Sequence, residues 1–151
     1  MLNLVTEPKR GIVVGRVVVS VRVVNVDDAR QAERGEIPIS DVRSVILPAL
    51  VDTGATFLCL PADMVNRLGL PFNRDRLSNT ITGPMTLRVF GGARLEIDGR
   101  TCDVEVMELP EGRQPLLGQI PLETLDFWVD VVNQRLVGNP EHGGEWMAEV
   151  Y

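Results

Sequence analysis

One short stretch of the chain carries residues whose types and spacing suit acid–base chemistry. Asp52-Thr53-Gly54 follows the apolar residues 49–51 and precedes a second apolar run at 57–60. This pattern predicts a carboxylate at the tip of a tight turn between two buried strands, where its position is fixed before any ligand arrives. Glycine at position 54 lets the backbone approach a neighbour or a ligand closely. The turn is therefore the first candidate for a catalytic site.

Two carboxyl groups held together can hydrolyse a peptide bond without a metal ion. One takes a proton from the attacking water, while the other, which must be protonated, gives a proton to the carbonyl oxygen. Like charges about 3 Å apart cannot both ionise, so such a pair retains one proton. The sequence contains one Asp-Thr-Gly and no Asp-Ser-Gly. The second equivalent carboxyl is therefore expected from another copy of the chain, in a symmetric homodimer.

The turn and a second motif resemble those of the aspartic proteases, especially the retropepsin-like family with a single catalytic motif per chain. Leu116-Leu117-Gly118, with a short helix expected after it, matches that family's second signature. The intervening β-rich stretch is where the family keeps its flap, and the resemblance spans most of residues 42–136. It implies a stand-alone domain of the bacterial type, with an all-β fold: a closed β-barrel of the double-psi acid-protease half, with one or two short helices.

The resemblance also implies roles for individual residues. Asp52 is the expected catalytic aspartate, Thr53 the residue that hydrogen-bonds across the two-fold axis, and Gly54 the one that presents its carbonyl to substrate. Gly118 is expected to support the turn, and the flap is expected at the hairpin around residues 80–85. The implied substrate-binding residues are Ala55, Thr56, Ile81, Thr82, Gly83, Met85 and Leu117.

Two positions depart from the retroviral pattern. Retroviral members usually have Asp where this chain has Thr56 and Arg where it has Gln119, a pair that ties the active-site loop to the following helix. Losing both together avoids an unpaired buried charge, so the fold is expected to survive the change. Substrate anchoring and dimer contacts of the retroviral kind are not implied.

Composition limits the classes of function. The 151 residues are expected to form one domain over 1–151, and a net charge of −6 with Lys9 as the only lysine argues against binding to nucleic acid or to a membrane surface. Neither a signal peptide nor a membrane span is expected. Cys59, Cys102 and His142 cannot form a disulfide framework or a zinc site within one chain. We therefore expect a cytoplasmic protein without a metal or a cofactor.

Apolar patterning predicts many short strands and few helices. The chain is expected to have a short helix over 61–69, a hairpin at Asp98-Gly99 and a helical turn over 121–125. The strands are expected at 11–26, 42–51, 57–60, 78–90, 93–97, 101–109, 127–132 and 135–137. Cys59 is expected in the core and His142 in an exposed turn without function. The alternating tail 145–151 is expected to be a strand, either at the dimer interface or at the edge of its own domain.

These observations favour an aspartic endopeptidase that acts on extended peptides or proteins. Residues such as Ile81, Met85 and Leu117 predict an apolar groove and hence apolar side chains beside the cut. The alternative is a non-catalytic dimeric module that binds or assembles proteins through the same fold, by adding a partner's strand. Retention of both Asp52 and Thr53 favours catalysis.

Overall fold

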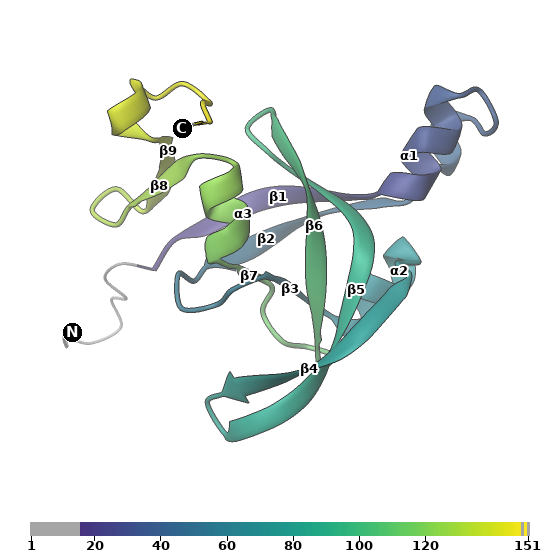
Figure 1. Cartoon of the computed structure of the whole chain (residues 1–151), viewed down its shortest axis with the longest axis horizontal. Helices are drawn as coiled ribbons and strands as arrows, with labels where there is room; N and C mark the ends of the chain where they lie inside the picture. The colour runs from purple at the N-terminus through teal and green to yellow at the C-terminus, as the bar shows by residue number, and fades with distance from the viewer. Residues whose placement is uncertain (1–15, 149, 151) are drawn as a thin grey trace.

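The computed structural model of the chain describes residues 16–148 and 150 (Figure 1). Its nine strands are β1 Val18–Asn25, β2 Ser44–Val51, β3 Leu58–Pro61, β4 Phe72–Thr80, β5 Gly83–Ile97, β6 Arg100–Leu109, β7 Leu116–Leu117, β8 Phe127–Asp130 and β9 Arg135–Gly138. The helices are α1 Val26–Glu33, α2 Ala62–Leu68 and α3 Gln119–Thr124, with single 3-10 turns η1 Ile39–Asp41 and η2 Pro140–His142.

Six of the strands form a closed ring. They pair in the order β1-β2-β7-β3-β6-β5, and an additional antiparallel pairing of β5 with β1 completes the circuit. Among the described residues, strand β4 pairs with β5 alone, and the β4–β5 hairpin extends beyond the ring at the bottom of Figure 1. Strands β8 and β9 form a separate hairpin. The expected all-β architecture is confirmed.

Apolar side chains that point into the ring form the main core. In β1, Val21 and Val23 are buried while Arg22 between them is exposed, which is the alternation of a strand with one dry face. Strand β2 repeats this pattern. A second, smaller cluster lies at the base of the β4–β5 hairpin and consists of Phe57, Cys59, Leu87, Val89 and Met107.

The helix predicted over 61–69 is confirmed as α2. Pro61 precedes its first turn, and Gly69 ends it with a φ of 62° in the left-handed region. A side chain at Gly69 would also collide with the guanidinium of Arg43. The Asp98-Gly99 hairpin is confirmed too, since both residues have positive φ and join β5 to β6.

Three local features differ from the expectations. No strand was expected over 72–77, but β4 begins at Phe72 because this polar, exposed segment pairs with β5. A strand was expected to end before Gly91-Gly92, but β5 continues through both glycines with a shift of register. The tail was expected to form a strand, yet residues 146–148 form none, and residues 149 and 151, like 1–15, lie outside the described part.

An ion pair between the buried Asp28 carboxylate and the half-exposed Arg43 guanidinium fixes α1 against the start of β2. The Asp28 carboxylate accepts hydrogen bonds from the backbone N–H of Arg43 at 3.0 Å and from its Nε at 2.8 Å. The Asp28 side chain is 9% exposed. Hydrogen bonding by Arg43 lowers the pKa of Asp28, so the folded protein favours the ionised carboxylate.

Replacing Asp28 with Asn is expected to lower Tm by a few degrees at about pH 7. Because the pKa is depressed in the folded state, the charge stabilises the fold above the unfolded value of about 3.9 and this stabilisation is lost as the pH falls through the lower folded value. Thermal unfolding of both proteins from about pH 7 to about pH 3 checks this. The expected gap in Tm narrows on acidification; a gap that widened would contradict it.

Candidate active site

The Asp52 turn leaves the carboxyl end of β2 and is held by its own backbone. Asp52 donates its N–H to the carbonyl of Leu117 at 3.0 Å, and its own carbonyl accepts from the N–H of Ala55 at 3.0 Å. Gly54 donates its N–H to Asp52 Oδ1 at 2.9 Å. Within the described part of the chain Oδ2 accepts no hydrogen bond. One carboxylate oxygen is thus oriented by the turn, and the other is available to a ligand.

Strand β7 lies between β2 and β3 and positions the turn. It runs parallel to β2, with Val51 beside Leu117, and antiparallel to β3, with Leu58 beside Leu117. The first residues of α3 continue the contact, because Gln119 donates to the carbonyl of Ala55 at 2.8 Å and Ile120 to that of Thr56 at 3.0 Å. The loop and the helix are therefore joined by backbone hydrogen bonds, where retroviral relatives were expected to use a charged pair.

Gly118 follows β7 directly and lies against the backbone of the loop that carries Asp52. A Cβ atom built there would be 2.4 Å from the carbonyl oxygen of Phe57 and 2.7 Å from that of Ala55, both of them backbone atoms. Only glycine fits without displacing the loop. A Cβ on Gly54 would likewise crowd Asp52 Oδ1, at 3.2 Å.

The structure brings most of the residues expected at the site to the surface of this loop. Asp52 and Ala55 are half-buried, while Thr53, Gly54 and Thr56 are exposed. Leu117 differs, because its side chain is completely buried in the main core. This burial does not fit the expected contact of its side chain with substrate, and its backbone carbonyl accepts the hydrogen bond from Asp52.

The expected flap position coincides with the tip of the β4–β5 hairpin. Ile81 and Thr82 form the two-residue turn, and Thr80 Oγ1 donates to the carbonyl of Gly83 at 2.7 Å. Ile81 is fully exposed and Met85 is 43% exposed, so both are available for contacts. The role of this hairpin as a flap remains a prediction.

The hairpin rests on the segment that follows the Asp52 turn. The Phe57 ring belongs to the same apolar cluster as Leu87 and Val89 of β5, and the guanidinium of Arg76 in β4 lies 5.4 Å from the ring centroid. The segment after the Asp52 turn and the β4–β5 hairpin therefore pack against each other in one apolar cluster.

Cys59 lies in this cluster and is inert. Burial, and secondarily the charge of Asp52, raises the pKa of its thiol to about 12. The thiolate required for nucleophilic chemistry is therefore absent near neutral pH. The expectation that Cys59 belongs to the core is confirmed.

Comparison with known families adds an independent finding. The family model described as aspartyl protease matches residues 39–119, which is more than half of the chain and includes both motifs. The chain belongs to the aspartyl protease family. Among curated proteins, none matches it significantly. In the described part of this aspartyl protease family member, no helix is long and apolar enough to cross a membrane.

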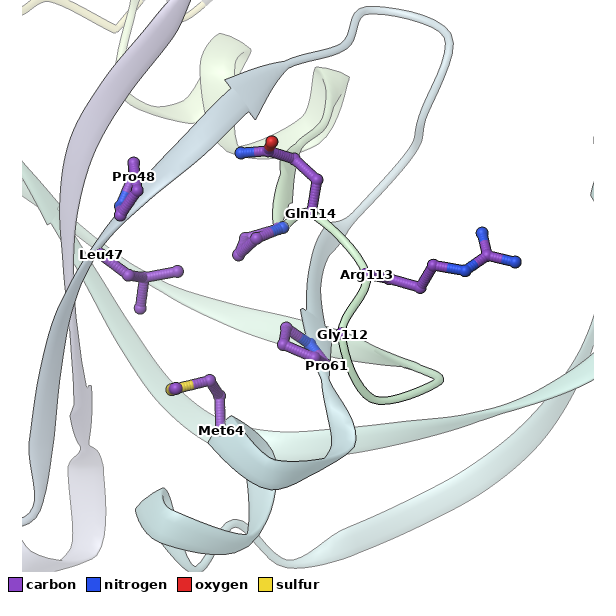
Figure 2. Close-up of a pocket in the computed structure, with 8 residues that line it drawn as sticks. Leu47, Pro48, Pro61, Met64, Gly112, Arg113 and Gln114 are labelled. Carbon is purple, nitrogen blue, oxygen red and sulfur yellow. The ribbon is translucent and has the colours of Figure 1, made fainter.

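The family member has a hollow that lies apart from the Asp52 turn. It encloses about 360 Å³ between β2, the start of α2 and the loop before β7 (Figure 2). Its lining includes Leu47, Pro61 and Met64 but no residue of the turn, and the guanidinium of Arg113 points away from these apolar side chains. None of the described residues that line this hollow carries a carboxylate.

His142 was expected to be exposed, and this expectation is wrong. Its side chain is 12% exposed, and Nδ1 lies 2.6 Å from Asp126 Oδ2. Asn139 donates to the other oxygen of Asp126 at 3.0 Å, and the hydrogen bond with His142 is the main cause that lowers the Asp126 pKa. The network borders a second hollow of about 540 Å³ beside α3. This hydrogen-bond network was not predicted, because Asn139 and His142 lie 13 and 16 residues beyond Asp126 in the sequence.

Proposed function

We propose that this member of the aspartyl protease family is an endopeptidase whose water is activated by a pair of Asp52 carboxyls, one from each copy in a homodimer. The geometry of the Asp52 carboxylate carries the proposal: Gly54 holds one oxygen at 2.9 Å, and the other accepts no hydrogen bond within the described residues. Such a group can position a water and accept its proton when a second, protonated carboxyl polarises the substrate carbonyl. The family membership supports a hydrolytic function of this kind.

The substrate in this proposal is an extended peptide or protein segment that passes between the turn and the β4–β5 hairpin. Thr53, Gly54 and Thr56 are exposed residues of the loop, so the main chain of a peptide can lie against them. Ile81 and Met85 offer apolar contact from the hairpin. The two cysteines are free, which suits the cytoplasmic location that forms part of the proposal.

Digestion of a diverse peptide library by the purified protein tests the proposal, with cleavage sites read by mass spectrometry. The expected result is internal cleavage that depends on Asp52. Peptides that bind without being cut would instead favour a protein-binding module, the alternative function of this fold.

A specific activity that depends on protein concentration is also expected. Since one chain supplies one Asp52, dilution below the dimer dissociation constant should remove the pair and abolish turnover. Sedimentation and activity measured over the same concentration series check this. A strictly monomeric protein that kept its full specific activity on dilution would contradict the shared pair.

A further inference from the structure

One arginine of the β4–β5 hairpin is unlike the other three in its contacts. Arg74 pairs with Glu105, Arg88 with Glu108 at 2.8 Å, and Arg94 with Asp103 at 3.0 Å. Arg76 forms no ion pair with any described residue. Its positive charge helps at longer range to lower the pKa of Glu105, but the groups that hydrogen-bond this carboxylate are Arg74 and Asn73. Arg76 is exposed, so its guanidinium is available to a ligand.

The register of the hairpin places Arg76 on the same face as the apolar residues near its tip. Arg76 lies opposite Leu87, and Ser78 lies opposite Met85. Residues two apart in a strand share a face, and directly opposed residues share it as well. This is the face that meets the segment after the catalytic turn, because Leu87 packs in the cluster that contains Phe57.

The Phe57 ring holds the Arg76 guanidinium in place. At 5.4 Å from the ring centroid, the cation lies within the range of a cation–π contact. In such a contact the N–H groups at the edge of the guanidinium remain free to donate. Because the ring already restricts the Arg76 side chain, less of its conformational entropy is lost when a ligand binds. Phe57 is only five residues beyond Asp52. The free cation is thus positioned against the segment that follows the turn.

We propose that Arg76 is a specificity-determining residue that binds an acidic side chain of the peptide substrate. This inference rests on the proposed function. A guanidinium edge donates two parallel hydrogen bonds to a carboxylate, an arrangement that an amide of similar shape cannot match. Asp or Glu is expected on one side of the cut, with apolar residues nearer the hairpin tip contacted by Met85. In a protein with a net charge of −6, a local cation is needed to attract such a substrate.

Paired peptides that differ only by Glu or Gln test the inference. The Glu position is first found among the library peptides that the Asp52→Asn protein binds, and kcat/KM of the parent is then compared for the pair. The expected preference for Glu is about tenfold, within the range of charge-assisted hydrogen bonds at a partly exposed site. In Arg76→Gln the ratio should fall to about one, and in Arg76→Glu a Lys-containing peptide should become the better substrate.

Two controls separate recognition from structure. Arg67→Gln removes an exposed arginine of α2 that also has no carboxylate partner among the described residues, and it should leave the Glu/Gln ratio unchanged. Thermal unfolding of Arg76→Gln measures any stability lost with the Phe57 contact. A purely structural role would lower Tm and alter cleavage of both peptides alike, leaving the ratio intact, and that result would overturn the inference.

Binding of the same peptide pair to the Asp52→Asn protein separates this inference from the proposed function. Cleavage without a preference for Glu would overturn the role of Arg76 and leave the endopeptidase in place. A preference for Glu in binding that is lost in a combined Asp52→Asn, Arg76→Gln protein would support the role of Arg76 even if the parent cut nothing. Peptides that are neither bound nor cut by the parent would overturn both.

Discussion

Replacing Asp52 with Asn is expected to reduce kcat/KM for peptide hydrolysis by at least about 10⁴-fold, on the scale observed when one member of a catalytic unit is removed. The amide can still accept the hydrogen bond that Gly54 donates to Oδ1. It cannot take a proton from water at any accessible pH, so the base is lost while the shape is kept. Initial rates on a peptide identified by library digestion measure the effect.

The Asp52→Asn protein is expected to remain folded and dimeric. Asp52 lies at a half-buried turn, and the substitution leaves no cavity. In a dimer it also removes the single negative charge that two crowded carboxyls share, so Tm should equal or exceed that of the parent. Sedimentation and thermal unfolding provide the necessary comparison. A folded dimer that cleaved as fast as the parent would exclude a mechanism based on Asp52.

Local sequence patterns predicted the features that short-range physics determines. The β-branched residues around Val21 and Val23 predicted a strand, and Gly69 marked the end of α2 because its backbone is left-handed. Asp98-Gly99 marked a hairpin for the same kind of reason. The site turn was predicted from the apolar runs on both sides of Asp52. In each case the determining interaction lies within a few residues of the signal.

Features that depend on distant partners were missed. Residues 72–77 have the polar composition of a loop, but pairing with β5 makes them a strand. Leu117 was expected in the groove because the motif lies near it, while β7 turns its side chain into the core. The exposure of His142 was misjudged because Asp126 and Asn139 surround it only after folding. The free charge of Arg76 became visible only when the partners of its neighbours were known.

Gly118 is the residue outside the turn whose substitution is expected to have the largest effect. Its φ is −89° and its ψ −174°, an extended backbone open to any residue, so alanine is not opposed by backbone conformation. The obstacle is space, because the new methyl would lie 2.4 Å from the Phe57 carbonyl oxygen and 2.8 Å from the Phe57 nitrogen. These are backbone atoms of the loop that leads directly into β3, and they cannot rotate away as a flexible side chain can. Either β7 or the loop that carries Asp52 must move.

We therefore expect Gly118→Ala to lower the free energy of unfolding by about 2–3 kcal/mol, the usual cost of overpacking. A displacement of the Asp52 loop by about 1 Å should also reduce kcat/KM about 100-fold. Gly91→Ala is a matched control, since its Cβ would meet only the Asn73 side chain at 3.4 Å and its expected cost is within about 0.5 kcal/mol. Denaturant unfolding and peptide hydrolysis check both proteins. If Gly118→Ala lost stability but kept its rate per folded molecule, β7 would support the fold without positioning Asp52, and the turn would owe its geometry to its own hydrogen bonds from Gly54 and Ala55.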